Sequence, residues 1–162
     1  MNGLLVVGIS DYIVSKSPAV LATYALGSCV GICLYDSTVK IGGLSHIMLP
    51  DSSMFPRDSN NRMKYADTAI VDMAEELTRK GADRRRLIAK IAGGAKMFEV
   101  HRGSQIGSIG DRNVDSVKMV LKSLKIPLVS EDTRKNYGRT VFFDLSTGVM
   151  KIQSLSKSTV EI

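Results

Sequence analysis

The sequence predicts an α+β fold in which a mixed or antiparallel β-sheet carries helices on its outside. Short apolar runs of strand length alternate with two longer segments whose apolar residues recur at helical spacing. Strands outnumber helices, and polar turns join several strands directly, which favours hairpins within a mixed sheet. The chain of 162 residues suits a single domain with its own core, which we place over residues 1–155.

Four strands are expected before the first helix, because each is an apolar run bounded by turn residues. The turn Asp36-Ser37-Thr38 connects the last two, and Pro50 opens a polar loop that runs to about residue 61. The expected strands cover residues 4–7, 20–25, 29–35 and 39–49.

Two helices are expected, each with one apolar face. The first spans residues 62–80 and ends at Gly81, a residue type that suits the position after a helix. The second spans residues 113–125 and is stopped by Pro127. The inward positions are Met63, Ala66, Ala69, Ile70, Met73, Ala74 and Leu77 in the first helix, and Val114, Val117, Val120, Leu121 and Leu124 in the second.

Further strands are expected between the helices and after them. Residues 87–92 form one that ends at Gly93-Gly94, and residues 128–131 form another. A polar loop, residues 132–139, leads to a hairpin whose turn is Ser146-Thr147-Gly148. The hairpin strands cover residues 140–145 and 149–155, and residues 156–162 are expected to fray.

The formal net charge of +6 fits either a solvated surface with an excess of Lys and Arg or an acidic partner, which could be nucleic acid, anionic lipid or an acidic protein. Aromatic residues make up 6% of the chain and Trp is absent, which ranks nucleic acid below an acidic protein because few side chains can stack on bases. No apolar run approaches the roughly 18 residues of a membrane span, and residues 1–8 lack the basic region of a signal peptide. We therefore expect a cytoplasmic protein without membrane insertion.

Two cysteines and two histidines make a poor zinc site, so no metal is expected. Cys29 lies in Gly27-Ser28-Cys29-Val30-Gly31, where small neighbours leave room for a substrate carbonyl. The backbone N–H groups of Ser28 and Cys29 could form an oxyanion hole. Each cysteine is either a core residue or a reactive thiol. Core burial is favoured for Cys33, and both interpretations stay open for Cys29.

A nucleophilic thiol needs a nearby base. If a two-residue loop at Ser37-Thr38 closes the hairpin, Cys29 faces His46 directly across the two strands. The other interpretation of His46 is a satisfied histidine at a strand end, and His101 is expected in a surface loop. The candidates for the group that orients the imidazole are Thr23, Asp51 and Asp132.

Several motifs occur together, in order, over most of residues 4–155. They are Thr23 with Ala25-Leu26-Gly27-Ser28-Cys29-Val30, then Gly42-Gly43-Leu44-Ser45-His46-Ile47-Met48-Leu49-Pro50-Asp51, Lys64-Tyr65-Ala66-Asp67-Thr68-Ala69, Ala89-Lys90-Ile91-Ala92-Gly93-Gly94-Ala95-Lys96-Met97-Phe98, Ile109-Gly110-Asp111-Arg112-Asn113, Glu131-Asp132-Thr133 and Gly138-Arg139. With these motifs at matching spacing, the chain resembles the chemoreceptor glutamine deamidases of the CheD family.

The resemblance implies papain-like chemistry on a fold similar to the catalytic domain of cytotoxic necrotizing factor, a mixed β-sandwich with outer helices. It implies Cys29 as nucleophile, His46 as base and Thr23 as orienting group. It also implies that glutamines on chemoreceptor coiled-coil helices become glutamates, without a metal or cofactor. A phosphatase of the CheC type, which acts on CheY-phosphate, is the second implied partner.

Both partners are expected to bind around the nucleophile, at Gly27, Pro50, Gly94, Met97 and Phe98. The same acyl-enzyme would also allow hydrolysis of glutamyl methyl esters. One departure from the family pattern is Arg134-Lys135-Asn136, where a glycine pair is common. The alternative function is a non-catalytic regulatory binding partner of the phosphatase, in which Cys29 is inert.

Overall fold

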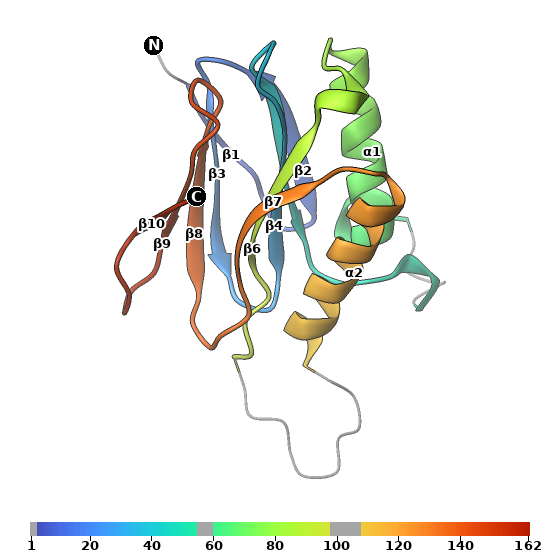
Figure 1. The fold of residues 1–162 in the computed structure, drawn as a ribbon. Coiled ribbons are helices and arrows are strands. Elements are labelled where there is room, and N and C mark those ends of the chain that lie inside the picture. The colour runs from blue at the N-terminus through green and yellow to red at the C-terminus, as the bar shows by residue number, and fades with distance from the viewer. Residues whose placement is uncertain (1–2, 55–59, 98–107) are drawn as a thin grey trace.

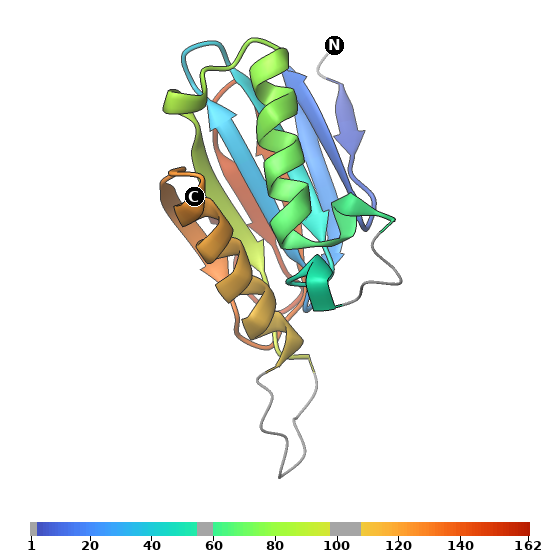
Figure 2. The same ribbon diagram turned by 90° about the vertical axis from the view of Figure 1, so that its right-hand side faces the viewer.

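The computed structural model describes residues 3–54, 60–97 and 108–162, which form three layers. Two five-stranded sheets pack face to face, and the helices α1 (Ala66–Arg79) and α2 (Ile109–Ser123) cover the outer face of one of them. Figure 1 shows these layers edge-on, and Figure 2 shows both helices lying over the covered sheet. The predicted α+β sandwich with flanking helices is confirmed.

Both sheets mix parallel and antiparallel strands. The uncovered sheet has the order β1 (Leu4–Val6), β3 (Val20–Leu26), β8 (Arg139–Asp144), β9 (Met150–Gln153) and β10 (Val160–Glu161). The covered sheet has the order β2 (Asp11–Lys16), β5 (Ile41–Ile47), β4 (Val30–Asp36), β6 (Ile88–Gly93) and β7 (Leu128–Thr133). In each sheet one pair is parallel: β1 with β3, and β6 with β7.

The apolar core is divided between two interfaces. Side chains such as Leu21 and Phe143 fill the space between the sheets. Met73 of α1 and Val117 of α2 pack against the other face of the covered sheet. Strand β4 is buried along its whole length because it is central in its sheet and covered on both sides.

The helices follow the predicted pattern, with shifted ends. The buried residues of α1 are those predicted for its inward face from Ala66 to Leu77, and a short 3-10 turn, η2 (Arg62–Lys64), precedes it. Helix α2 begins earlier than predicted, because the Ser108 hydroxyl accepts a hydrogen bond from the Asp111 N–H at 3.2 Å and caps the first turn. Two further 3-10 turns are η1 (Ser52–Met54) and η3 (Arg84–Arg86).

Two strands were not expected from the sequence. Strand β2 is a half-buried edge strand that pairs with β5. It was not predicted because its apolar residues Ile13 and Val14 form only a short run between polar residues. Residues 160–161 pair with β9 as β10, whereas the sequence predicted a frayed tail over residues 156–162. Met150 and Ile162 also exchange two backbone hydrogen bonds there. Within the described ranges, no helix is long and apolar enough to cross a membrane.

Candidate active site

Thr23 and His46 meet across the interface between the two sheets. Thr23 lies on β3 and His46 on β5, and both side chains are fully buried. The Thr23 hydroxyl oxygen is 2.7 Å from Nδ1 of His46. The other candidates for orienting the imidazole, Asp51 and Asp132, have partners elsewhere. Of the three candidates, Thr23 is the one that contacts the imidazole.

The hydrogen bonds of Thr23 decide which imidazole nitrogen is basic. Its hydroxyl also lies 2.8 Å from the backbone oxygen of Val7, which can only accept. The single hydroxyl proton is therefore donated to Val7, and the Thr23 oxygen accepts from the Nδ1–H of His46. The lone pair then resides on Nε2, a buried atom without a hydrogen-bond partner among the described residues. His46 is thus held in the tautomer that can take up a proton at Nε2.

Cys29 immediately precedes β4, and its side chain packs on the face of the covered sheet that carries His46. The predicted register was wrong: Gly31 rather than Cys29 stands opposite His46, a shift of two residues. The cause is a longer turn, residues 37–40, which Lys40 closes in the left-handed conformation (φ 56°). Because side chains alternate with a period of two, this shift keeps Cys29 on the same face as His46. Accordingly, the half-buried Cys29 side chain packs against the core between the sheets.

The backbone around Cys29 is held by the segment that follows β6. The N–H of Gly94 donates to the Cys29 carbonyl and the N–H of Ala95 to the Gly27 carbonyl, each at 2.8 Å. Gly93 has a φ of +110°, and a Cβ there would collide with the Cys29 carbonyl oxygen, so only glycine fits. Outside the thiol of Cys29 itself, no described residue accepts a hydrogen bond from the N–H groups of Ser28 or Cys29. Within the described ranges, neither N–H group is therefore used in a hydrogen bond to another residue.

Burial sets the resting charge of the thiol and the imidazole. It lowers the pKa of His46 to about 4. It raises the pKa of the Cys29 thiol, and the residue's own backbone N–H acts in the opposite direction. At neutral pH both groups are therefore uncharged. Neither group is therefore present at rest as the thiolate or the imidazolium of an ion pair.

The residues predicted to form a partner surface differ in exposure. Met97 is exposed, and a Cβ placed on the half-buried Gly27 would lie 3.1 Å from Met97 Cγ. Pro50 and Gly94 are buried, so they support neighbouring loops and do not themselves present a surface. Two residues considered above, Phe98 and His101, lie outside the described residues.

Asn113 had no predicted role, yet α2 directs its buried side chain at the loop that carries Cys29. Its Nδ2 atom lies 2.9 Å from the Ser28 carbonyl oxygen and 2.9 Å from the Met48 carbonyl oxygen. A signal was present in the sequence, since Asn113 lies four positions before the inward-facing Val117 and shares its helix face. A polar side chain on such a face needs partners.

Residues 48–154 match a family described as CheD chemotactic sensory transduction. A protein of Moorella thermoacetica is 52% identical over 152 residues, which cover 93% of this chain and 90% of the relative. The chain belongs to the CheD family. Other similar proteins come from Caldanaerobacter subterraneus subsp. tengcongensis, at 49% identity over 94% of this chain and 93% of the relative, and from Clostridium novyi, at 51% over 92% and 91%. All three relatives bear the name "Probable chemoreceptor glutamine deamidase CheD".

Among solved structures, this CheD-family chain is similar to one titled "Crystal structure of Bacillus licheniformis hypothetical protein YfiH". The TM-score is 0.49 at 15% sequence identity, over 76% of this chain and 50% of that chain. A likeness at this level supports no argument about function.

The departure from the CheD pattern at Arg134-Lys135 has a structural counterpart. Both residues have left-handed backbone conformations, with φ of 68° and 63°, which glycine adopts at lower cost. The Arg134 guanidinium also contacts the carboxylates of Asp111 at 2.6 Å and Asp115 at 2.8 Å, both on α2. These ion pairs tie the late loop to the helix that carries Asn113.

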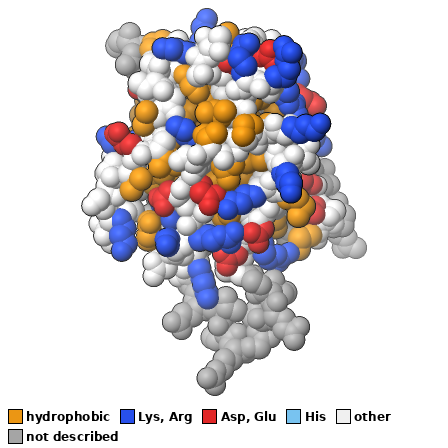
Figure 3. All heavy atoms as spheres, in the orientation of Figure 1, with side chains coloured by type: hydrophobic (Ala, Val, Ile, Leu, Met, Phe, Trp, Pro, Cys, Tyr) orange, Lys and Arg blue, Asp and Glu red, His pale blue; other side chains and the backbone are white. Residues whose placement is uncertain are grey.

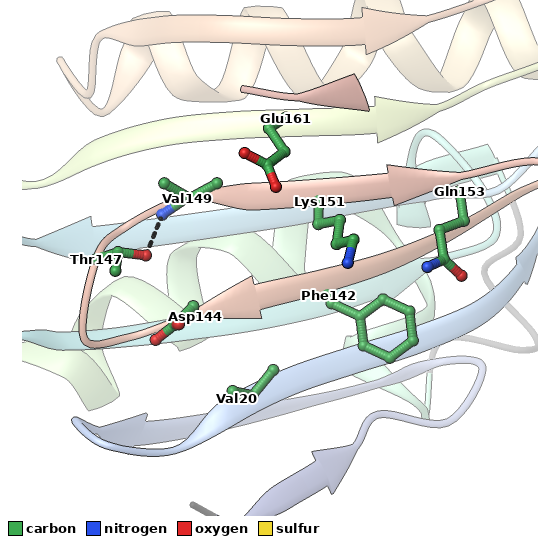
Figure 4. Close-up of a pocket in the computed structure, with 8 residues that line it drawn as sticks. All are labelled: Val20, Phe142, Asp144, Thr147, Val149, Lys151, Gln153 and Glu161. Carbon is green, nitrogen blue, oxygen red and sulfur yellow. Dashed lines mark hydrogen bonds between the residues drawn. The ribbon is translucent and has the colours of Figure 1, made fainter. Parts of the chain in front are cut away.

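Two surface hollows lie on or beside the uncovered sheet. One of 520 Å³ opens on its outer face (Figure 4) and is lined by Val20, Phe142, Asp144, Thr147, Val149, Lys151, Gln153 and Glu161. The other, of 650 Å³, includes Ala25, Met97, Tyr137 and Leu155, and it adjoins Gly27 through Met97. The second hollow thus has a lining residue, Met97, that lies beside Gly27 in the loop before Cys29. In the part of the chain that the structure describes, no three His, Cys, Asp or Glu side chains are grouped as metal ligands.

Proposed function

We propose that this CheD-family chain converts glutamine side chains of chemoreceptors to glutamate, with Cys29 as the nucleophile. The relatives' name gives the reaction and the class of substrate. The observation that carries the proposal is the Thr23–His46 hydrogen bond, which leaves Nε2 as the basic atom on the face of the sheet that Cys29 shares. A base presented in this way can activate a thiol.

In the first half of the reaction, the Cys29 sulfur attacks the carboxamide carbon while its proton passes to Nε2 of His46. Because both groups are neutral at rest, this proton transfer accompanies the attack. The developing oxyanion is bound by the N–H groups of Ser28 and Cys29. The imidazolium then gives its proton to the leaving nitrogen, ammonia departs and a thioester remains.

In the second half, His46 takes a proton from a water molecule, which attacks the thioester carbon. The carbon–sulfur bond breaks, the sulfur regains a proton from His46, and the glutamate side chain is released. A glutamyl methyl ester would enter the same sequence with methanol as the leaving group. We propose this methylesterase reaction as a second activity of the same site.

The hollow beside Met97 suits an amphipathic, acidic helix of a receptor coiled coil. Ala25, Met97 and Leu155 supply apolar lining. The Tyr137 ring lies under the Arg139 guanidinium at 4.4 Å and 5.8 Å from Lys157 Nζ. Lys135 and Lys157 line an adjoining hollow with Tyr137. An apolar floor with a basic rim complements a helix that has one apolar face and acidic flanks.

A CheC-type phosphatase is the proposed second partner, on the same surface. Two separate interfaces of ordinary size would each bury ~800 Å² on this chain. A phosphatase helix that resembles a receptor helix but offers no glutamine to Cys29 would cover the site without turnover. Binding of the phosphatase would then inhibit deamidation by excluding the receptor.

The test of the proposed function compares the two cysteines in the same protein. Cys29→Ala should abolish deamidation of a receptor cytoplasmic fragment, measured by mass spectrometry, while the fold stays intact. Cys33→Ala is the matched control, because Cys33 is a buried core thiol on β4 and should retain activity. Deamidation by the Cys29→Ala protein would rule out Cys29 as nucleophile. It would leave the rival function, a binding module with an inert Cys29, as the better account of this cysteine.

A further inference from the structure

The side-chain amide of Asn113 can be assigned from its partners. Both atoms that it approaches, the carbonyl oxygens of Ser28 and Met48, can only accept hydrogen bonds. The nitrogen of the amide must therefore face them and donate to both. The opposite atom, Oδ1, is buried and has no partner among the described residues. Asn113 thus uses its two donors entirely to hold two backbone carbonyls, and leaves its acceptor unpaired to do so.

The carbonyl that Asn113 holds belongs to the peptide unit whose N–H is that of Cys29. In a planar trans peptide the C=O and the N–H point in opposite directions. Holding the Ser28 carbonyl toward α2 therefore aims the Cys29 N–H away from α2, to the side of the covered sheet on which the Cys29 side chain packs. The rotation of this peptide about its chain axis is fixed by a side chain 85 positions away in sequence.

The neighbouring peptide is held in the same manner. The Ala95 N–H binds the Gly27 carbonyl, so the N–H of Ser28 on that peptide points the other way. Helix α2 reaches this segment because Gly110 has no side chain: a Cβ there would lie 2.5 Å from the Ala95 carbonyl oxygen. Three residues of the motif Ile109-Gly110-Asp111-Arg112-Asn113 therefore have separate roles. Gly110 lets α2 approach the Ala95 carbonyl closely, and Asp111 forms an ion pair with Arg134. Asn113 holds the Ser28 peptide.

We infer that Asn113 is the positioning residue of the oxyanion hole, which fixes the Cys29 N–H in the orientation that binds the developing negative charge. This inference rests on the proposed function, since it concerns the transition state of that reaction. The side chain of Asn113 donates to the Ser28 and Met48 carbonyls and makes no hydrogen bond to the thiol or the imidazole. Its loss should therefore weaken binding of the oxyanion and leave the Cys29–His46 pair in place.

Two rates measured on the same full-length protein separate this role from a purely structural one. Deamidation of a receptor fragment passes through an oxyanion, whereas alkylation of Cys29 by iodoacetamide is a displacement at a saturated carbon and forms none. Asn113→Asp keeps the side-chain volume and removes both donors. We expect kcat for deamidation to fall about 10- to 100-fold, below the roughly 10²- to 10³-fold loss on deleting a donor outright. KM and the alkylation rate should change less than about twofold.

The matched control is Ser116→Ala on the same helix. The Ser116 hydroxyl donates to the Pro50 carbonyl at 2.6 Å, so this change also removes a bond from α2 to the backbone after β5 but leaves the Ser28 peptide alone. Its kcat should stay near that of the unaltered chain. Asn113→Ala, which also removes the unpaired Oδ1, is the second variant should Asn113→Asp fail to fold.

The same measurements distinguish a failure of the proposed function from a failure of the proposed role of Asn113. If the unaltered chain does not deamidate the receptor fragment, the proposed function is wrong. If it does, and the Asn113 variants keep its kcat, the positioning role is wrong. If both Asn113 variants lose alkylation and deamidation in parallel, or neither folds, Asn113 serves the fold alone and the inference is overturned.

Discussion

At the scale of single residues, the function proposed here depends on four hydrogen-bonding atoms, which are the Val7 carbonyl oxygen, Thr23 Oγ1, and Nδ1 and Nε2 of His46. The Val7 carbonyl, the Thr23 hydroxyl and the His46 imidazole form a chain in which each member's role is set by the one before it. The buried location then keeps the imidazole neutral, with a pKa lowered to about 4. A base that is unprotonated at neutral pH can act as soon as substrate arrives.

Thr23→Val tests this chain directly, because it replaces the hydroxyl by a methyl group of similar size. The buried Nδ1–H of His46 would lose its acceptor, so the tautomer with a free Nε2 would lose its preference. We expect kcat to fall about 10- to 100-fold, less than the ~10²- to 10⁴-fold contribution of a general base. Thr23→Ser keeps both hydrogen bonds and should stay within a few-fold of the unaltered rate. Equal rates for the Val and Ser variants would show that the hydroxyl does not orient His46.

The residue types of the site could be predicted from sequence, but their exact pairing could not. The glycine-flanked setting of Cys29 and the face shared with His46 follow from local pattern and the period of a strand. The predicted register, with Cys29 directly opposite His46, was wrong. No residue between Asp36 and Ile41 indicates how many residues the turn contains. The role of Asn113 was missed because its partner carbonyls, on Ser28 and Met48, lie far away in sequence.

At the scale of elements, the late loop between β7 and β8 shows how a departure from the family pattern is accommodated. Arg134 and Lys135 both adopt left-handed conformations, each of which costs a residue with a side chain roughly 1 kcal/mol relative to glycine. Arg134 has two ion pairs to α2 that offset part of this cost. Exposed Lys135 has no ion pair within the described part of the chain.

The two positions should therefore respond differently to glycine. Lys135→Gly should raise the free energy of unfolding by about 0.5–1 kcal/mol, since it relieves strain and removes no ion pair. Arg134→Gly relieves the same strain but loses the contacts to Asp111 and Asp115, so it should give no gain or a loss. Urea unfolding of both variants measures the difference. A destabilisation by Lys135→Gly equal to that by Arg134→Gly would contradict this account.

Elements with a clear apolar period were predictable, whereas elements that depend on neighbours were not. Helix α1 and the central strands β4 and β6 were found because burial imposes a pattern on their own residues. Strand β2 was not predicted because an edge strand forms backbone hydrogen bonds with one neighbouring strand only, so its sequence is weakly constrained. Strand β10 is short and exists through its pairing with β9, which local sequence does not reveal.

At the scale of the whole molecule, the net charge of +6 matters through its distribution. On the face drawn in Figure 3, Lys and Arg side chains stand among Asp and Glu side chains and among hydrophobic ones, and do not form one continuous basic surface. Such a mixed surface suits recognition of a shaped acidic partner more than non-specific binding of a polyanion. The basic rim near Tyr137 is where we expect this charge to act.

A competition experiment tests the shared surface. With the Cys29→Ala protein, which binds receptor without consuming it, a saturating CheC-type phosphatase should displace a labelled receptor fragment. With the unaltered protein, the phosphatase should also slow alkylation of Cys29, because it covers the thiol. Simultaneous binding of both proteins with unchanged affinities would show that the phosphatase binds elsewhere.

The positions that must meet to build the site are spread widely along the chain. Thr23 and His46 are 23 residues apart, and Ser28 and Asn113 are 85 apart. On a ribosome, the segment that carries Cys29 is therefore finished long before α2 has been made, and contacts of such long separation form late in folding. On the mechanism proposed above, a chain that stops before α2 would lack the side chain that holds the Ser28 peptide. The site would then be completed only when the second half of the chain docks onto the first.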